Sequence, residues 1–443
     1  MLDRRTMIGA GLALAASPQA VIAASARNRL EFPRGFLWGA ATAGHQVEGN
    51  NVNADTWLLE NIKPTVYAER SGDATNSFEL WSRDLDLVKQ MGLNTYRFSL
   101  EWSRIEPEAG LFSVAMLDHY KNIIAGCLQR GITPFVTFNH FTTPRWFAAQ
   151  GAWTNNASAD LFARFCDRAA RHLADGIGYA ATLNEPNLNA VIRNLFTPEM
   201  FAGVKLVTNK MKEAARRASG SPQFMAGSMM VADDEAAMTR NMIAAHHAGR
   251  AAIKGVRSNL PVGVTLSIPD DQAVGSISIR DKVRADTYLA WLEAARGDDF
   301  VGVQNYDRNL WDARGKVTPP VNGDRNASGN GVYPDSLANA VRYAYSVAKV
   351  PIIVTEHGVD SEDDAVRARL IPAALVELRK AMDEGIPVKG YVHWSLLDNF
   401  EWVAGYKPKY GLIAVDRKTF KRTPKPSSTI LGAIARQNAL SGK

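Results

Sequence analysis

Two glutamates stand where runs of β-prone residues end, and both are candidates for acid–base or nucleophilic chemistry. The run YAATL leads into Asn184 and Glu185 and must stop at Pro186, which has no amide hydrogen to continue a ladder. Glu356 ends a second run, IIVTE. A carboxylate at the last residue of an apolar strand lies at the rim of a sheet or barrel, where chemistry is usually placed. The alternative for an isolated glutamate is a solvated charge or a helix cap.

The elements that must position these glutamates follow an alternating pattern. β-Prone runs and helical patterns succeed one another along the chain, which is the layout of parallel βα units. Eight runs are apparent: Phe36–Thr42, Thr95–Trp102, Ile132–His140, Tyr179–Pro186, Val262–Ile268, Phe300–Tyr306, Ile352–Glu356 and Gly390–Leu397. The clearest helical stretches are Leu80–Met91 and Met116–Arg130, with apolar residues three and four positions apart. Eight such units predict an α/β fold, a (β/α)₈ TIM barrel with its active site at the carboxyl ends of the strands.

A doubly wound open sheet is the competing α/β architecture, and it requires a glycine-rich phosphate turn after the first strand. Here that strand runs instead into the sequence HQVEG at residues 45–49, which cannot cradle a dinucleotide. The chain contains no 20–50-residue repeat, low-complexity tract or obvious linker. We therefore expect one catalytic domain over residues 27–443.

Several strand ends resemble the signatures of glycoside hydrolase family 1. Residues 32–49, FPRGFLWGAATAGHQVEG, are similar to its amino-terminal signature, and residues 96–107, YRFSLEWSRIEP, to its second strand. The segments NHFTTP, TLNEP, IIVTEHG and HWSLLDNFEWVAGYKPKYGLIAVD resemble later motifs of the family, in the same order. The resemblance runs from about Phe32 to about Asp416, which is nearly the whole of the expected domain.

The resemblance implies a retaining β-glycosidase that forms a covalent glycosyl-enzyme and acts on small neutral β-glycosides, foremost β-glucosides, without a cofactor. Glu185 corresponds to the general acid/base and Glu356 to the nucleophile. For a retaining enzyme the two carboxyl groups should stand about 5–5.5 Å apart, whereas an inverting enzyme needs about 6.5–9.5 Å. The alternatives are a transglycosylase that uses the same intermediate and a non-catalytic periplasmic sugar-binding barrel.

The resemblance also assigns residues around the two glutamates. Those that correspond to substrate-binding positions are Gln46, His140, Asn184, Trp394, Glu401 and Trp402, and those that would support the nucleophile are Arg97, Asn305 and Tyr306. Arg97 near Glu356 would favour the ionised carboxylate, and the charge of Glu356 would keep Glu185 protonated. Glu401 favours a neutral glycone over a phosphorylated one. The alternatives are rim packing for the tryptophans and a structural role for His140.

Some positions depart from the family pattern. Thr142 stands where an aspartate is usual, and His357 replaces an asparagine beside the nucleophile. Where the family commonly has two tyrosines after Asn305, this chain has Tyr306 and Asp307, so either Tyr306 takes the role of the second tyrosine or Asp307 is a new feature of the site. These departures suggest an altered subsite or aglycone preference. Residues 187–227 lack the tryptophan that often follows NEP, which predicts a more open aglycone entrance.

Residues 1–26 have the features of a twin-arginine signal peptide. Arg4 and Arg5 precede an apolar, alanine-rich run, and the residues Ala24, Ser25 and Ala26 offer a small-residue cleavage site. An uncleaved membrane anchor is the alternative, but the apolar stretch is short and broken. We therefore expect export to a bacterial periplasm, with no membrane attachment after cleavage.

Charge, histidine and cysteine positions argue against nucleic-acid binding and a metal site, and they favour free thiols. The net charge of +6 is dispersed without a run of five basic residues, so nucleic-acid binding is not expected. His246 and His247 are adjacent on a predicted helix, where neighbouring side chains point about 100° apart and chelate poorly, so no metal is implied. Cys127 and Cys166 lie in amphipathic patterns that favour buried thiols, with a disulfide as the alternative.

Overall fold

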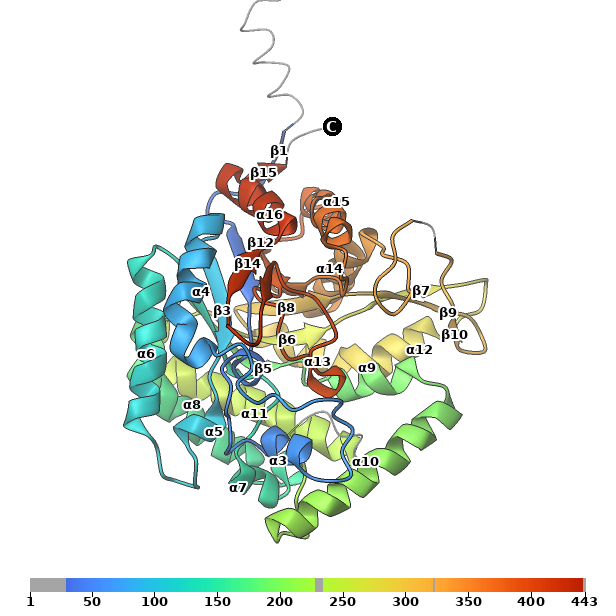
Figure 1. Ribbon diagram of the computed structural model, residues 1–443. Helices are drawn as coiled ribbons and strands as arrows, with labels where there is room; N and C mark the ends of the chain where they lie inside the picture. The colour runs from blue at the N-terminus through green and yellow to red at the C-terminus, as the bar shows by residue number, and fades with distance from the viewer. Residues whose placement is uncertain (1–28, 228–233, 322, 441–443) are drawn as a thin grey trace, which may run out of the picture.

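The computed structural model describes residues 29–227, 234–321 and 323–440. Its centre is a closed, eight-stranded parallel barrel surrounded by helices (Figure 1). The strands follow one another around the barrel in chain order: β2 (Leu37–Ala41), β3 (Thr95–Ser99), β4 (Thr133–Asn139), β5 (Tyr179–Asn184), β6 (Val262–Ser267), β8 (Phe300–Asn305), β11 (Ile352–His357) and β12 (Val388–Trp394). The predicted (β/α)₈ barrel is confirmed, and closure of the sheet excludes the doubly wound alternative.

Both faces of the barrel strands are covered, which explains their composition. All residues of β2, β3, β6, β8 and β11 are buried, as expected for parallel strands with side chains on one face and helices on the other. Small residues let neighbouring strands approach. At Gly263 in β6 an added Cβ would lie 2.1 Å from the carbonyl oxygen of Phe300 in β8. Within each strand the side chains alternate, so every second residue near a carboxyl end points toward the barrel axis.

Helices cover the outside of the barrel. The longer ones are α4 (Ser77–Met91), α6 (Val114–Gln129), α8 (Ser158–Leu173), α10 (Pro198–Ser219), α11 (Glu235–Val256), α14 (Asp335–Ala348), α15 (Asp364–Asp383) and α16 (Pro426–Gln437). Two match the clearest helical predictions, α4 and α6. The hydroxyl of Ser113 caps α6 by accepting from the amide of Met116, and α4 ends at Gly92 in the left-handed region, with φ of +80°.

Shorter helices and strands complete the described structure around the barrel. The helices are α2 (Gly44–Val47), α3 (Asp55–Asn61), α5 (Trp102–Ile105), α7 (Arg145–Ala149), α9 (Leu188–Leu195), α12 (Arg280–Arg284) and α13 (Ala290–Ala294). A three-stranded sheet has the order β10 (Lys316–Val317), β9 (Arg308–Trp311), β7 (Asp270–Ala273) and is visible at the right of Figure 1. Strands β13 (Ile413–Val415) and β14 (Arg422–Pro424) form a hairpin, and β1 (Leu30–Glu31) pairs with β15 (Ala439–Leu440).

The structure also tests the expectations for the two cysteines and for a membrane-spanning helix. Cys127 in α6 and Cys166 in α8 are both free and buried, so the alternative of a disulfide is wrong. His246 is buried in α11, and its Nδ1 lies 2.7 Å from the hydroxyl of Thr182 in β5, so the side chain joins the helix to the barrel. No helix within the described ranges has the length and apolar character needed to span a bilayer. The predicted signal peptide, residues 1–26, lies outside the described residues.

Candidate active site

The carboxyl ends of the barrel strands enclose a cavity of about 500 Å³. Glu185 follows β5 and Glu356 lies in β11, and both line this cavity. The remaining lining residues are Gln46, His140, Phe141, Asn184, Leu188, Val191, Leu195, Ser267, Pro269, Gln304, Tyr306, Asp307, Arg308, Asn309, Lys316, Pro319, Ser328, Asn330, Trp394, Glu401, Trp402 and Tyr410. The barrel therefore brings the two glutamates, 171 positions apart in sequence, to one pocket.

Three hydrogen-bond donors surround Glu356. Its Oε1 accepts from Nη1 of Arg97 at 2.6 Å and from Nε2 of Gln304 at 2.9 Å, and its Oε2 accepts from the hydroxyl of Tyr306 at 2.5 Å. Burial raises the pKa of Glu356, while Arg97, Tyr306 and Gln304 act in the opposite direction by stabilising the carboxylate. Glu356 is therefore held in one orientation with its negative charge compensated.

Arg97 is itself held by neighbouring strands. It is almost fully buried in β3, and its Nε donates to the hydroxyl of Thr137 in β4 at 3.1 Å. Its Nη2 donates to Oδ1 of Asn184 in β5 at 2.5 Å. Asn184 Nδ2 in turn lies 3.2 Å from Nε2 of His140. The guanidinium group is thus fixed by side chains from β4 and β5.

Glu185 has a different environment. Its backbone lies in the left-handed region, with φ of +43°, and its amide donates to the carbonyl of Thr265 at 2.8 Å. A non-glycine residue in that region stores strain of about 1–3 kcal/mol. Within the described structure, its buried Oε1 has no hydrogen-bond partner. Burial, and secondarily the negative charge of Glu356, raises the pKa of Glu185 well above its ordinary value.

The two carboxyl groups therefore differ as acid–base chemistry requires. Glu356 has three donors that favour its ionised form, whereas burial and the nearby charge favour the protonated form of Glu185. A pair of carboxyl groups with separated pKa values can supply a proton at one position and a nucleophile at another. This electrostatic asymmetry agrees with the roles expected from the sequence.

Polar groups gather at the end of the cavity near Glu401. Gln46 Nε2 donates to Oδ1 of Asn399 at 2.9 Å and to the carbonyl of Phe400 at 2.8 Å, and lies 3.3 Å from Oε2 of Glu401. The indole nitrogen of Trp394 donates to Oε1 of Glu401 at 3.2 Å. Burial raises the pKa of Glu401 to about 8. Because its donors are used, Gln46 presents its Oε1 as an acceptor, which has no partner among the described residues.

Aromatic rings form one wall of the same end. The ring of His140 stacks on Trp394, with centroids 5.7 Å apart, and on Trp402 at 6.2 Å. Burial, together with Arg97, lowers the pKa of His140 well below its usual value, so the imidazole is neutral. The tryptophans therefore do two things at once: they pack on His140, and they line the cavity where a sugar ring could stack.

Asn305 does not support the nucleophile, and that prediction is wrong. Its Nδ2 donates to the carbonyl of Ile268 at 3.0 Å, and its Oδ1 accepts from the hydroxyl of Ser336 at 2.8 Å. Side chains alternate along β8, so Gln304 and Tyr306 face the cavity while Asn305 faces away. Gln304, which sequence reasoning missed, contacts Glu356 and also donates to Oδ1 of Asn184 at 2.8 Å.

The three departures from the family pattern lie in different places. The hydroxyl of Thr142 donates to Glu101 at 2.8 Å, and Nδ1 of His357 lies 2.9 Å from the hydroxyl of Tyr391, and neither residue lines the cavity. Asp307 does line it. Burial raises the pKa of Asp307, and the charge of Lys316 opposes the shift. Because Tyr306 contacts Glu356, the first of the two sequence alternatives holds, and Asp307 is an additional group at the cavity wall.

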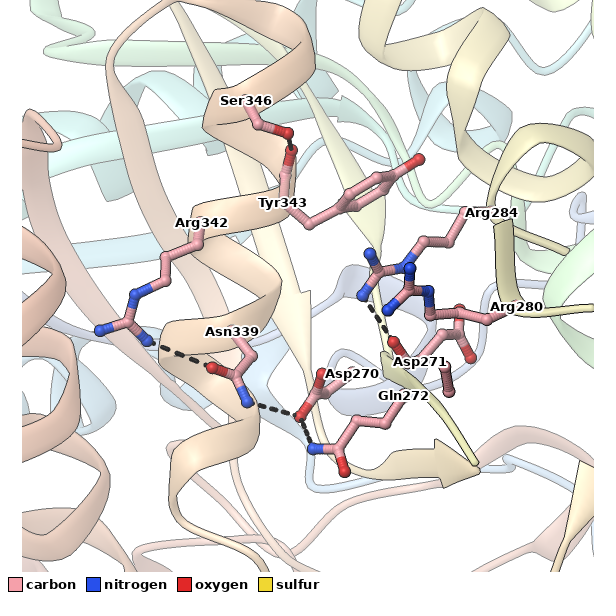
Figure 2. A pocket seen from close by; sticks show the side chains of 10 residues that line it. Asp270, Asp271, Gln272, Arg280, Arg284, Asn339, Arg342, Tyr343 and Ser346 are labelled. Carbon is pink, nitrogen blue, oxygen red and sulfur yellow. Dashed lines mark hydrogen bonds between the residues drawn. The ribbon is translucent and has the colours of Figure 1, made fainter. Parts of the chain in front are cut away.

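A second cavity, of about 550 Å³, lies among β7, α12 and α14 (Figure 2). Asn339 donates to Asp270 at 2.9 Å, and Arg284 donates to the main-chain oxygen of Asp271 at 2.5 Å. The carboxylate of Asp271 accepts from Asn309 at 3.0 Å and from Trp311 at 2.7 Å. Both carboxyl groups are thus engaged by neighbouring side chains, and Asp271 fixes Asn309, which lines the active-site cavity.

Thr137 and Thr265 are further supporting residues without a signal in the sequence. Thr137 holds Arg97, and the hydroxyl of Thr265 donates to Oδ1 of Asn184 at 3.0 Å. Both occupy the middle of β-prone runs, where threonine is common for reasons of strand propensity alone. Gln304, by contrast, was open to detection, since strand alternation places it on the same face as Tyr306.

Comparison with known proteins agrees with this geometry. A sequence model of glycosyl hydrolase family 1 matches residues 28–215 and 303–440. Beta-glucosidase A of Thermotoga maritima is 30% identical over 452 residues, covering 93% of this chain and 99% of that protein. The crystal structure of beta-glycosidase BGL167 has a TM-score of 0.86 at 43% identity, covering 93% of this chain and 99% of the other. The apo structure of a beta-glucosidase, 1317, has a TM-score of 0.87 at 39% identity, covering 91% and 98%. This chain belongs to glycoside hydrolase family 1.

Proposed function

We propose that this protein hydrolyses small neutral β-glycosides, foremost β-glucosides, with retention of anomeric configuration, using Glu356 as nucleophile and Glu185 as acid/base. The observation that carries the proposal is the asymmetry of the two carboxyl groups within one cavity. Donors compensate the charge of Glu356, while burial and that charge keep a proton on Glu185. The named relatives, a β-glucosidase and a β-glycosidase, support the substrate class.

In the first step, an oxygen of Glu356 attacks the anomeric carbon while Glu185 gives its proton to the glycosidic oxygen. The bond to the aglycone breaks, the aglycone leaves as an alcohol, and a covalent glycosyl-enzyme remains. Formation of the ester removes the negative charge of Glu356. Since that charge helps to raise the pKa of Glu185, the pKa of Glu185 then falls, and Glu185 becomes a base.

In the second step, Glu185 accepts a proton from water, and the resulting hydroxide attacks the anomeric carbon. The bond to Glu356 breaks, and its carboxylate returns to the three donors that held it before. Two inversions at the same carbon give net retention. Glu185 ends the cycle protonated, so no other group need enter the reaction.

The end of the cavity beside Glu401 suits the glycone. Gln46 presents an acceptor oxygen, Glu401 presents a carboxyl group, and His140 presents its Nδ1, which is unpartnered among the described residues. A sugar hydroxyl can donate to Gln46 and to Glu401, and another can accept from Nδ1 of His140, which carries the proton because Nε2 accepts from Asn184. Gln46, the neutral His140 and the carboxyl group of Glu401 offer no positive charge to a phosphorylated sugar, so this end of the cavity favours a neutral glycone.

Azide rescue tests both roles. Glu356→Gly should abolish hydrolysis of p-nitrophenyl β-glucoside, and azide should restore turnover by entering the vacated space and giving the α-glucosyl azide. Glu185→Gly should still form the glycosyl-enzyme from this activated substrate, and azide should then attack from the other face and give the β-glucosyl azide. Normal turnover by Glu356→Gly, or the same azide anomer from both variants, would refute the assignment.

We also propose that the protein is exported to the periplasm, supported by the paired arginines and cleavage site within residues 1–26. Replacing Arg4 and Arg5 together by lysine should retain the activity in the cytoplasmic fraction of the producing cells. Unchanged recovery from the periplasmic fraction would contradict the proposal.

A further inference from the structure

Helix α9 occupies the position where the aglycone must leave. It begins at Leu188, three residues after Glu185, and Glu185 is the residue that protonates the aglycone oxygen in the proposed reaction. A group attached to that oxygen therefore lies beside the first turns of α9. This link rests on the proposed function, since it takes the role of Glu185 from there.

One face of α9 is aliphatic, and it faces the cavity. Leu188, Val191 and Leu195 are three and four positions apart, so they lie on the same side of the helix, and all three line the cavity. An amphipathic helix normally turns such a face into the protein core. In α9, Val191 is mostly buried and Leu188 packs partly against the core, whereas Leu195 is 44% exposed, so the apolar face continues from the core to the cavity mouth. Aliphatic side chains that line an open cavity indicate an apolar ligand.

This wall is unsuited to a second sugar. Aliphatic side chains offer no partner for the hydroxyl groups of a pyranose, which would lose their hydrogen bonds to water on contact. Both tryptophans of the cavity lining, Trp394 and Trp402, lie at the other end, stacked on His140. The lining thus places ring-stacking groups around the glycone and leaves an aliphatic surface for the aglycone.

Polar groups lie elsewhere around the mouth. Asp307 follows β8, Asn309 is in β9, and Lys316 is in β10, and all of them line the cavity. Asp271 orients the amide of Asn309 by accepting from it at 3.0 Å. An aglycone could therefore place one edge on α9 and leave a polar edge or end near β9 and β10.

We propose that the aglycone subsite recognises an extended aliphatic alcohol, bound along Leu188, Val191 and Leu195, in preference to a second sugar. The distance along α9 from Leu188 to Leu195 is about 10 Å, seven residues at about 1.5 Å each, which approaches the length of an octyl chain. Affinity then grows with the length of the alkyl chain until the chain passes Leu195.

Calorimetric titration with n-alkyl 1-thio-β-glucosides tests this, because thioglycosides resist hydrolysis and binding is then measured apart from turnover. Full burial of a methylene strengthens binding about fourfold, so a wall on one side of the chain should contribute about twofold. We expect the dissociation constant to fall about 16-fold from the butyl to the octyl compound. The heat-capacity change of binding should become more negative along the series.

Two exposed leucines provide a matched pair of variants. Leu195→Ser should weaken binding of the octyl compound about threefold to tenfold and leave the butyl compound unchanged, because only the longer chain reaches Leu195. Leu206→Ser is the control, since Leu206 is 59% exposed in α10 and does not line the cavity. It should change neither affinity by more than about twofold.

Dissociation constants that do not vary with chain length would overturn the inference, as would equal effects of the two leucine variants. A thio-linked disaccharide that binds more tightly than octyl thioglucoside would show that the subsite prefers a sugar. Hydrolysis of p-nitrophenyl β-glucoside with retention is measured separately. If that reaction is present and the chain-length series is flat, the aglycone inference fails while the proposed function stands.

Discussion

Tyr306→Phe removes a single hydrogen bond from the proposed nucleophile and should raise the pKa of Glu356. The hydroxyl of Tyr306 donates to Oε2 of Glu356 at 2.5 Å, and it stabilises the charged form of the carboxylate. A hydrogen bond to a charged group contributes about 1.5–3 kcal/mol, and one pKa unit corresponds to about 1.4 kcal/mol. The pKa of Glu356 should therefore rise by about one to two units. The phenyl ring fills nearly the same space, so the fold should be unchanged.

The assay is the pH dependence of kcat/KM for p-nitrophenyl β-glucoside, whose acidic limb reports ionisation of the nucleophile in the free enzyme. Because Glu356 must be ionised to attack, a higher pKa moves that limb to higher pH, and activity is lost first at acidic pH. Tyr410→Phe is the control: Tyr410 packs edge-on against Tyr306, with centroids 5.6 Å apart, and lines the same cavity. Its acidic limb should stay in place.

An acidic limb that does not move in Tyr306→Phe would refute the argument that this hydroxyl stabilises the charge of Glu356. So would an equal shift in Tyr410→Phe, because a general change in cavity polarity would then be the cause. In Tyr306→Phe the carboxylate keeps two of its three donors, Arg97 and Gln304, so measurable activity should persist.

Three further predictions concern Glu401, the two amides of β8 and the two cysteines. Burial raises the pKa of Glu401 to about 8, so the folded state binds more protons than the unfolded state between the ordinary glutamate pKa and about pH 8, and stability falls as pH rises through that range. Glu401→Gln should therefore raise the thermal midpoint by calorimetry more at pH 8 than at pH 5, while it lowers turnover; equal shifts at both pH values would contradict this. Gln304→Ala should move the acidic limb of kcat/KM to higher pH, because it removes a donor to Glu356. Asn305→Ala should leave that limb in place. It should lower the free energy of unfolding in urea by about 1–3 kcal/mol, because it leaves the buried carbonyl of Ile268 and hydroxyl of Ser336 without their hydrogen-bond partner. Burial raises the pKa of Cys127 to about 12 and that of Cys166 well above its usual value, so a thiol reagent should detect neither cysteine in the folded protein and both after denaturation; rapid labelling of the native protein would count against the structure.

The order of the barrel strands could be predicted from the sequence. Parallel strands that are covered on both faces require runs of apolar, β-prone residues, and helical patterns separate these runs. The order of the strands can therefore be predicted from the sequence. The ends of the strands were predicted less accurately. The eighth strand was expected at Gly390–Leu397, whereas β12 is Val388–Trp394. Strand ends depend on hydrogen bonds to neighbouring strands, which local composition does not encode.

In the active site, too, some residues could be predicted from the sequence and others could not. Glu185 and Glu356 were identifiable because a charged residue at the end of a buried strand is unusual enough to stand out. Arg97 was identified through the resemblance of residues 96–107 to the second strand of the family. Asn305 was assigned in place of Gln304 because the two amides are adjacent in sequence. Strand alternation puts Gln304 on the same face as Tyr306, but the sequence left open whether Tyr306 faces the cavity, and the register of β8 decides that point.

By itself, the sequence determined the family, the succession of eight βα units and the two glutamates, because each depends on residue type and order along the chain. The tertiary structure alone decided that Tyr306 takes the contact with Glu356, that Thr142 and His357 point away from the cavity, and that α9 turns an aliphatic face toward it. These outcomes depend on strand register and helix rotation. Both are fixed by packing between segments far apart in sequence, since a rotation of one residue moves a side chain to the other face.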